Sequence, residues 1–416
     1  MKKLSIIVCV YNTDKVYLAE CLESITESTL GGCADLPSAD YEILLIDDGS
    51  SVDYTDIVEK YGVRYHKTEN RGIFRARLLG IELAEGEYIA FCDSDDTVTV
   101  NYHRPMLELA KRDGAEIVIN DWAFRTERSR YYCQSDETVR DDIYLENDGC
   151  ITAFLAQSGR MHSYYVLWNK VFSSELLKTV AQTVRHIAEG EERFNYSEDA
   201  LMSFHAFRLA KRVENLHTGY YFYRIHDSQS VAVASEEKLL RQIECMKKTL
   251  AEMKSGVAEL NDSATLFRYV DEWARLMSRT HYSYAKKGGY RSLYPIIKEA
   301  YGVDELHSSY HSDSYAYSKT ALIGSNITDI DRLLLDAFKN GTPICRKELE
   351  PYAQRVIEGM SEIGGRVEFA DSEGLKIPKE YVSFKRKLYH NPLVYKLGMT
   401  LFPKGSRIRA FLKRKL

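Results

Sequence analysis

Three carboxylates follow a short apolar run in this sequence. The run is Tyr88–Cys92, and Asp93, Asp95 and Asp96 come directly after it. Carboxylates gathered at one point repel each other unless a cation lies between them. A hard divalent ion such as Mn²⁺ or Mg²⁺ takes oxygen ligands and shares them with phosphate. The pattern therefore predicts a site for such an ion and a phosphate-bearing ligand, although Asp-x-Asp alone also occurs in turns.

Two earlier apolar runs also end in polar residues. Leu4–Asn12 is apolar except for Ser5 until it ends in Tyr11 and Asn12, and Tyr41–Asp48 ends in two carboxylates. A helical stretch that carries arginines, Asn70–Ile81, follows the second run. Strands that alternate with helices predict a parallel sheet, whose ligands bind at the carboxyl ends of the strands. We expect these side chains to share that edge: Tyr11, Asn12, Asp47, Asp48, Arg77, Asp93 and Asp95.

Taken together, these segments resemble the family 2 glycosyltransferases and their GT-A nucleotide-sugar fold. They appear in the family's order and approximate spacing: Ser5–Asn12, Ile46–Ser50, Asn70–Arg77 and Asp93–Asp96. The resemblance covers roughly residues 1–230 and implies an α/β fold, with a mostly parallel, Rossmann-like sheet flanked by helices. A mainly α-helical C-terminal region is expected to follow. The implied activity is an inverting, metal-dependent transfer of a sugar from a nucleotide-sugar donor, without a covalent glycosyl-enzyme.

The resemblance implies a donor site at the ends of the first strands. Tyr11 and Asp48 would contact the nucleoside base, and a carboxylate there can accept the imide N–H of uracil or thymine. This favours a UDP-sugar, with a dTDP-sugar as the alternative. Asp47–Ser50 has a second interpretation as a capped turn, and Arg77 has one as a surface helix residue. The expected donor-binding residues are Val10, Tyr11, Asn12, Asp47, Asp48, Asn70, Arg77, Asp93 and Ser94.

The same resemblance places the metal on Asp95 and the general base on Asp199. Asn195–Met202 resembles the family's Glu-Asp motif at a helix start, where the aspartate deprotonates the acceptor hydroxyl. The alternative is that Ser197-Glu198-Asp199 only caps a helix, whose N-terminal end favours acidic residues.

Two segments resemble family elements less specifically. Tyr220–Val231 resembles a Tyr-Arg-x-His-x-x-Ser stretch of the family, whose side chains approach the diphosphate or the metal, although here three residues separate His226 from Ser230. The resemblance makes His226 the expected second metal ligand. Its alternative is an ordinary histidine. Trp168 would stack on a sugar ring or belong to the core. Further candidates are Asp96, Trp168, Lys170, Glu198, Arg224 and Ser230.

The chain of 416 residues has room for two or three domains. A strongly amphipathic helix is expected at Glu236–Met253, which follows a change of character after Val231. We therefore expect a catalytic domain at 1–232, a helical domain at 236–375 that binds the acceptor or forms a homo-oligomer, and a basic amphipathic tail at 376–416. Further expected elements are helices at Val16–Thr26 and Arg75–Glu85 and a strand at Ala115–Asn120.

The tail carries 12 Lys and Arg residues against one acidic residue, Glu380, whereas the whole chain has a net charge of −5. Ile408, Phe411 and Leu412 would share one face of a terminal helix, which suits an anionic membrane surface. The alternative is a solvated basic terminus. The acidic body would repel phosphate, so no nucleic-acid partner is expected.

The cysteines and the apolar runs bear on the compartment. Eight cysteines lack metal-ligand spacing, and no run approaches the roughly 18–20 apolar residues that a membrane helix needs. Lys2–Val10 runs into polar residues without a cleavage site, which favours a strand over a signal peptide. We expect reduced thiols in a cytoplasmic protein, peripheral on the inner face of the cell membrane if the tail binds lipid.

Other function classes fit the sequence less well. A sugar nucleotidyltransferase would carry a glycine-rich basic loop where Tyr11–Asp14 stands, and a dehydrogenase would need Gly-x-Gly-x-x-Gly there. A non-catalytic carbohydrate-binding or assembly subunit with a degenerate transferase fold would not need Asp199. By family analogy the acceptor is a cell-surface glycan or a lipid-linked molecule. The sugar, the acceptor and the linkage stay open.

Overall fold

The computed structural model describes most of the first three quarters of the chain and four short strands beyond it. The described residues are 2–26, 36–99, 102–126, 132–134, 143–157, 162–190, 193–225, 235–307, 322–323, 344–345, 368–370 and 374–376. The chain divides into two compact units, residues 1–127 with 135–316, and residues 128–134 with 317–416. The domain boundaries expected at 232–236 and 375–376 stay predictions.

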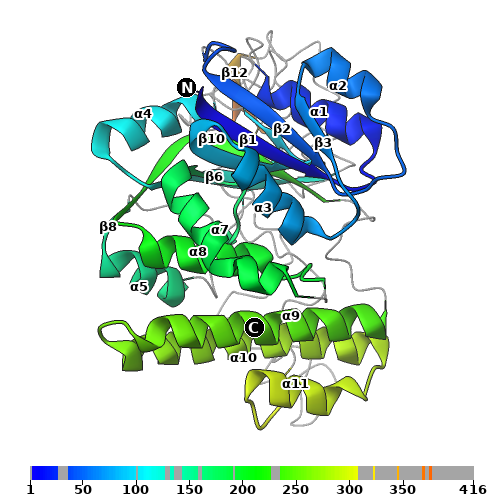
Figure 1. Ribbon diagram of the computed structural model, residues 1–416, viewed down its shortest axis with the longest axis vertical. Coiled ribbons are helices and arrows are strands. Elements are labelled where there is room, and N and C mark those ends of the chain that lie inside the picture. Colours follow the sequence, from blue (N-terminus) through cyan, green and yellow to red (C-terminus); the bar gives the residue numbers. More distant parts are fainter. Residues whose placement is uncertain are drawn as a thin grey trace. The chain divides into compact units, whose positions relative to one another are not determined.

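A mixed β-sheet forms the centre of the first unit (Figure 1). Its strand order is β6–β9–β4–β1–β2–β3. The four strands on one side of the sheet are parallel: β1 (Lys2–Val10), β2 (Tyr41–Asp47), β3 (Arg64–Lys67) and β4 (Gly86–Asp93). β9 (Lys170–Ser173) lies antiparallel between β4 and β6 (Ile117–Thr126). The mostly parallel sheet expected from the apolar runs is confirmed, with this antiparallel insertion.

The register of the parallel strands brings their polar ends together. Val10 pairs with Asp47, and Cys9 pairs with Asp93. The interior residues of β1, β2 and β4 are buried almost without interruption, as expected for strands covered on both faces. The predicted shared edge therefore exists at the ends of β1, β2 and β4.

A long strand pairs with β6 on the side of the sheet away from β3. β10 (Arg212–Ile225) runs parallel to β6 and pairs antiparallel with β5 (Thr97–Val98) and β8 (Tyr144–Glu146). Because β5 follows the Asp93–Asp96 cluster directly, this pairing brings the end of β10 next to those carboxylates.

Helices surround the sheet, and several begin with a side-chain cap. Asp14 accepts a hydrogen bond from Val16 N at the start of α1 (Lys15–Ile25), and Ser173 does the same for α7 (Ser174–Ala188). The expected helices at Val16–Thr26 and Arg75–Glu85 are confirmed within two residues. They are α1 and α3 (Ile73–Leu83). The further helices around the sheet are α2 (Thr55–Tyr61), α4 (His103–Asp113), α5 (Asp148–Gln157), α6 (His162–Tyr165) and α8 (Glu198–Leu209).

Two long helices, α9 (Glu236–Ala258) and α10 (Ser263–Gly288), lie side by side (Figure 1). α7 and α8 lie between this pair and the sheet, and α11 (Leu293–Tyr301) packs on the pair. α9 buries one stripe of apolar residues: Leu239, Ile243, Met246, Leu250, Met253 and Val257. The amphipathic helix expected at Glu236–Met253 and the mainly helical C-terminal region are thereby confirmed.

The second unit contains short strands that the sequence analysis did not predict. β7 (Tyr132–Gln134) pairs with β11 (Leu322–Ile323). β14 (Gly374–Lys376) pairs with β12 (Ile344–Cys345) and β13 (Glu368–Ala370). Apart from Lys376, the proposed basic tail lies outside the described residues. None of the helices in the described part is long and apolar enough to cross a bilayer.

Candidate active site

Hydrogen bonds join the loops that follow β1, β2 and β4. The Asn12 backbone N–H donates to Ser50 Oγ at 2.9 Å, and Asn12 Oδ1 accepts from Ser51 N at 2.8 Å. The hydroxyls of Thr13 and Ser94 lie 2.7 Å apart. Tyr11 remains 54% exposed beside these contacts. The expected donor residues at the three strand ends are therefore close together, with an aromatic ring accessible at their rim.

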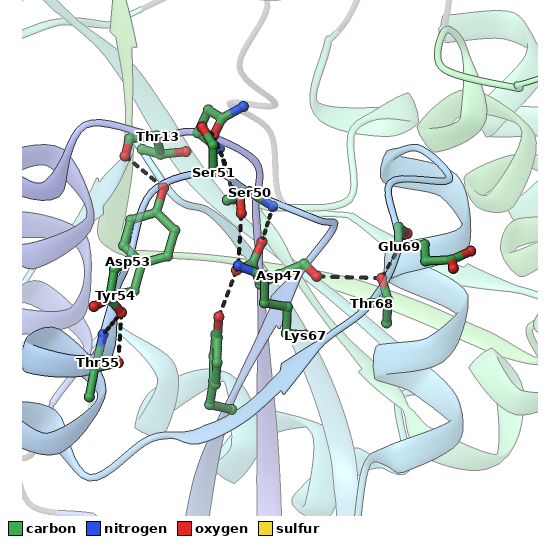
Figure 2. Close-up of polar contacts among 12 residues, drawn as sticks. Thr13, Asp47, Ser50, Ser51, Asp53, Tyr54, Thr55, Lys67, Thr68 and Glu69 are labelled. Carbon is green, nitrogen blue, oxygen red and sulfur yellow. Dashed lines mark hydrogen bonds and ion pairs between the residues drawn. The ribbon is translucent and has the colours of Figure 1, made fainter.

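Asp47 is buried and stabilises the turn after β2. It accepts hydrogen bonds from Ser50 N at 2.7 Å and from the Tyr65 hydroxyl at 2.6 Å, and Lys67 Nζ lies 3.5 Å away. Figure 2 shows Asp47 with Ser50, Lys67 and Thr68 around it. Burial raises the pKa of Asp47, but the hydrogen bonds outweigh it and hold that pKa below its ordinary value. This geometry is the capped turn that was the alternative interpretation of Asp47–Ser50.

Asp48 holds the loop that follows β3. Its two carboxylate oxygens accept from Arg71 N at 2.7 Å and from Gly72 N at 2.8 Å. Gly72 has φ +96°, and a Cβ there would lie 1.9 Å from Asn195 Oδ1. A hollow of about 500 Å³ opens beside Asp48, within the size range of ligand pockets. Its lining is Asp48, Thr68, Glu69, Arg71, Arg75, Ala76 and Leu79.

Arg77 connects the end of β4 to the start of α8. It is 5% exposed, and it donates to Glu198 Oε1 at 2.7 Å and to Asp93 Oδ1 at 3.1 Å. The alternative of a surface arginine is therefore wrong. Burial raises the pKa of Glu198 to about 7, against the opposing effect of the Arg77 charge.

The carboxylates at the end of β4 and directly after it have different environments. Burial raises the pKa of Asp93, and Arg77 opposes this shift. The neighbouring charges of Asp95 and Asp199 raise the pKa of Asp93 further. Asp96 is buried and its pKa lies well above the ordinary range, because of burial and the charges of Asp95 and Asp93.

Asp96 organises the end of β10 beside the cluster. It accepts from the Tyr221 hydroxyl and from Arg224 N, each at 2.7 Å. The Tyr221 hydroxyl in turn accepts from Asp93 N at 2.9 Å. The Arg224 side chain donates to the Asp95 carbonyl at 2.6 Å and to Glu20. Asp96 and Arg224 are thus engaged in supporting the loop that carries Asp95.

Asp199, the candidate base, is the second residue of α8. Its Oδ1 accepts from Ala200 N at 2.7 Å. Ser197 precedes the helix with φ +62°, and its side chain makes no capping hydrogen bond. The alternative that this segment only caps α8 therefore does not hold for Ser197. Lys170 is buried nearby, and burial lowers its pKa well below the ordinary range, while the charge of Asp199 opposes the shift.

Lys170 and Trp168 lie in the interior. The Lys170 ammonium donates to Asn169 Oδ1 at 2.7 Å and to the carbonyls of Ser163 and Val166. Trp168 is 4% exposed and stacks on Tyr221, with ring centroids 4.3 Å apart. Trp168 therefore belongs to the core, which was the alternative to stacking on a sugar ring. Lys170 stabilises the turn before β9.

The carboxylate oxygens of the site are ligands that suit a hard divalent cation. Asp93 and Asp95 offer oxygen ligands whose mutual repulsion a cation would relieve. Within the part of the chain that the structure describes, no three His, Cys, Asp or Glu side chains are grouped as a metal site. Mg²⁺ commonly uses one or two carboxylates together with substrate phosphates. The two carboxylates fit such a shared site, while His226 and Ser230 lie outside the described residues.

The sequence analysis missed two residues that support the carboxylate cluster at the end of β4. Tyr221 connects Asp93 N to Asp96, and Glu20 pairs with Arg224. Tyr221 belongs to the Tyr220–Val231 segment that carried a weak signal, whereas Glu20 is an unremarkable helix residue in the sequence.

Comparisons with known proteins identify the family of this chain. Residues 5–169 match the family described as Glycosyl transferase family 2. The putative glycosyltransferase EpsH of Bacillus subtilis is 30% identical over 276 residues, which are 65% of this chain and 72% of that relative. The poly(ribitol-phosphate) beta-glucosyltransferase of Bacillus spizizenii is 27% identical over 56% of this chain and 34% of its own length.

The fold also matches a solved structure. The crystal structure of S. aureus TarS 1-349 in complex with UDP-GlcNAc aligns with a TM-score of 0.53 at 19% identity, over 91% of this chain and 97% of that chain. At this identity the match establishes the fold, which is GT-A-like. The chain belongs to glycosyl transferase family 2 and is a glycosyltransferase.

Proposed function

We propose that this enzyme transfers a sugar from a UDP-sugar, with inversion, to a hydroxyl of a cell-surface glycan or of a lipid-linked acceptor. The observation that carries the proposal is the connection through Arg77, which joins Asp93 on the donor edge to the first turn of α8, where Asp199 lies. Inverting transfer needs a leaving-group site and a base held in fixed relation. This network supplies that relation.

The donor would bind along the ends of β1, β2 and β4. The Asp48 oxygens each accept one backbone hydrogen bond, and a carboxylate oxygen can accept another. Asp48 can therefore still receive the imide N–H of uracil, with Tyr11 against the base. The relatives support UDP over dTDP, since the TarS structure contains UDP-GlcNAc. The names of TarS and of the Bacillus spizizenii relative, both poly(ribitol-phosphate) glycosyltransferases, support a polymeric acceptor that carries hydroxyl groups.

Asp95 and Asp93 are the residues that would hold Mn²⁺ or Mg²⁺, with His226 as a further ligand. The ion, when bound, supplies a Lewis acid that offsets the charge developing on the leaving diphosphate. Arg77 neutralises part of the charge of Asp93, and Asp96 with Arg224 fixes the loop of Asp95. These residues hold the donor end of the site in place.

Asp199 would take the proton of the acceptor hydroxyl. A base of this kind contributes about 10²–10⁴-fold to the rate. Glu198 keeps its side chain on Arg77, so it acts as a support for the first turn of α8. The acceptor oxygen must approach from the face opposite the leaving diphosphate for inversion to occur.

The test is UDP release from a panel of UDP-sugars with Mn²⁺, for the wild type, Asp95→Ala and Asp199→Asn. We expect one donor to turn over, Asp95→Ala to lose metal-dependent turnover, and Asp199→Asn to lose about 10²-fold or more while still binding UDP. Asp56→Asn is the control, because Asp56 is an exposed residue paired with Lys15. UDP binding without turnover of any donor would favour a non-catalytic binding subunit instead.

A further inference from the structure

The segment Arg193–Ser197, which leads into α8, contacts the donor-side loop Asn70–Gly72. Arg193 donates to the Asn70 carbonyl at 3.0 Å. Asn195 packs against Gly72 so closely that a Cβ on Gly72 would lie 1.9 Å from Asn195 Oδ1. One side of this segment is therefore fixed to the loop that Asp48 holds.

The other side of the segment is fixed to α9. The Thr249 hydroxyl donates to the Cys245 carbonyl at 3.2 Å, so its single proton is used there. The Ser197 hydroxyl, 2.7 Å from Thr249 Oγ1, must then be the donor in that contact. Both side chains are buried. Ser197 has φ +62° and ψ 13°, a left-handed conformation that a serine rarely adopts without outside support.

A third contact comes from α10. His281 is fully buried, and burial lowers its pKa to about 3, so the ring is neutral. Its Nε2 lies 3.3 Å from the Tyr196 hydroxyl, and its Nδ1 is hydrogen-bonded to the Tyr301 hydroxyl of α11. α9 and α10 thus contact residues 196–197, and α11 contacts His281, the residue of α10 that does so.

We propose that α9 and α10 set the position of Asp199 through this segment, with Thr249 and His281 as positioning residues for the base. The proposal rests on the role of Asp199 in the proposed function. The Ser197 carbonyl accepts from Leu201 N at 2.9 Å, which is the first hydrogen bond of α8. The orientation of Ser197 therefore fixes the first turn, and Asp199 lies within that turn.

This assigns a role to the helical region that does not require direct contact with a substrate. A displacement of about 1 Å at a reacting group can cost about 10²-fold in rate. The contact between Ser197 and Thr249 is a single hydrogen bond between buried hydroxyls, so its loss changes the position of the segment without opening the core. The base would move while the donor edge stayed in place.

The matched variants are Thr249→Val, which removes the hydroxyl at constant shape, and Thr249→Ser, which keeps it. With the UDP-sugar that the panel identifies, we expect Thr249→Val to lower kcat about 10-fold or more with UDP affinity within about twofold. Thr249→Ser should stay within about twofold of the wild type. Wild-type kcat in Thr249→Val, or an equal loss in both variants, would overturn the proposal.

Amide hydrogen exchange gives a readout that needs no turnover. With UDP bound, we expect the amides of residues 199–201 to exchange about tenfold faster in Thr249→Val than in the wild type and to be unchanged in Thr249→Ser. Tyr196→Phe, which removes only the hydroxyl facing His281, should show a smaller effect in the same direction and serves if Thr249→Val does not fold. Equal protection in every variant would overturn the proposal.

Asp199→Asn separates this proposal from the one on which it rests. Full activity of Asp199→Asn would overturn the base assignment and the positioning role together. Loss of activity in Asp199→Asn, combined with wild-type kcat and exchange in Thr249→Val, would overturn the positioning role alone.

Discussion

At the scale of single residues, the close approach of Gly72 to Asn195 connects donor and base sides of the site. Gly72 donates its N–H to Asp48, and its φ of +96° with ψ 159° lies in a region that is essentially confined to glycine. Asn195 occupies the space that a side chain would need. In the sequence Gly72 looks like an ordinary loop glycine. In the structure it determines how closely the Asn70–Gly72 loop approaches the Arg193–Ser197 segment.

Gly72→Ala should accordingly damage both stability and donor binding. We expect a loss of about 1–3 kcal/mol in the free energy of unfolding from backbone strain, and weaker UDP binding because the Asn70–Gly72 loop must shift. Gly62→Ala is the control, since Gly62 also has a positive φ, +60°, but nothing lies within 4 Å of its added Cβ. Urea unfolding and UDP calorimetry measure the two effects, and equal losses in both variants would contradict the role given to Asn195.

At the scale of elements, α8 joins the catalytic edge to the core. Its first turn carries Glu198 and Asp199, and the residues from Ala200 to Phe207 are buried. His205 lies on this helix with neither ring nitrogen hydrogen-bonded to any described residue. Burial lowers the pKa of His205 to about 4, and the charges of Arg208 and His186 act in the same direction. Burying a polar ring without hydrogen-bond partners costs free energy of folding. We therefore expect the protein to be less stable with His205 than with an apolar residue at that position.

His205→Leu should therefore stabilise the protein, most clearly at acidic pH. The folded pKa of His205 lies below the ordinary 6.5, so the wild type loses stability as pH falls from about 6.5 towards 4, by up to about 3 kcal/mol. The leucine variant lacks this loss. We expect a gain of about 1 kcal/mol at pH 7 and a larger gain at pH 5 in urea unfolding.

His186→Gln is the control for His205→Leu, because the His186 side chain is exposed and contacts Glu252. It should change stability little at either pH. A destabilised His205→Leu variant at both pH values would mean that the ring packs better than its unpaired nitrogens suggest.

At the scale of the whole molecule, local patterns determined the strands and their shared edge, but not the partners of the charged residues. The apolar runs that end in Asn12, Asp48 and Asp93 predicted this edge because a parallel sheet aligns its carboxyl ends. Arg77 and Glu198 are 121 residues apart, and no local pattern could pair them. The burial of Trp168 and the contact of Thr249 with Ser197 likewise depend on long-range packing.

The Arg77–Glu198 pair should make the stability of the folded molecule depend on pH in a direction unusual for a carboxylate in an ion pair. Burial raises the pKa of Glu198 from its ordinary 4.5 to about 7, so between these values the folded state binds more protons than the unfolded state. The contribution of Glu198 is therefore fully present below about pH 4.5 and is lost as pH rises through 7. The loss amounts to up to about 3 kcal/mol.

Glu198→Gln removes this titration while keeping the shape of the side chain and a hydrogen-bond acceptor for Arg77. Relative to the wild type, we expect the variant to gain stability steadily as pH rises from 5 to 8, measured by urea unfolding at each pH. Glu59→Gln, at an exposed position on α2, should follow the wild type at every pH. A Glu198→Gln variant that loses stability relative to the wild type over this range would show that the Arg77 charge outweighs burial, with Glu198 ionised throughout.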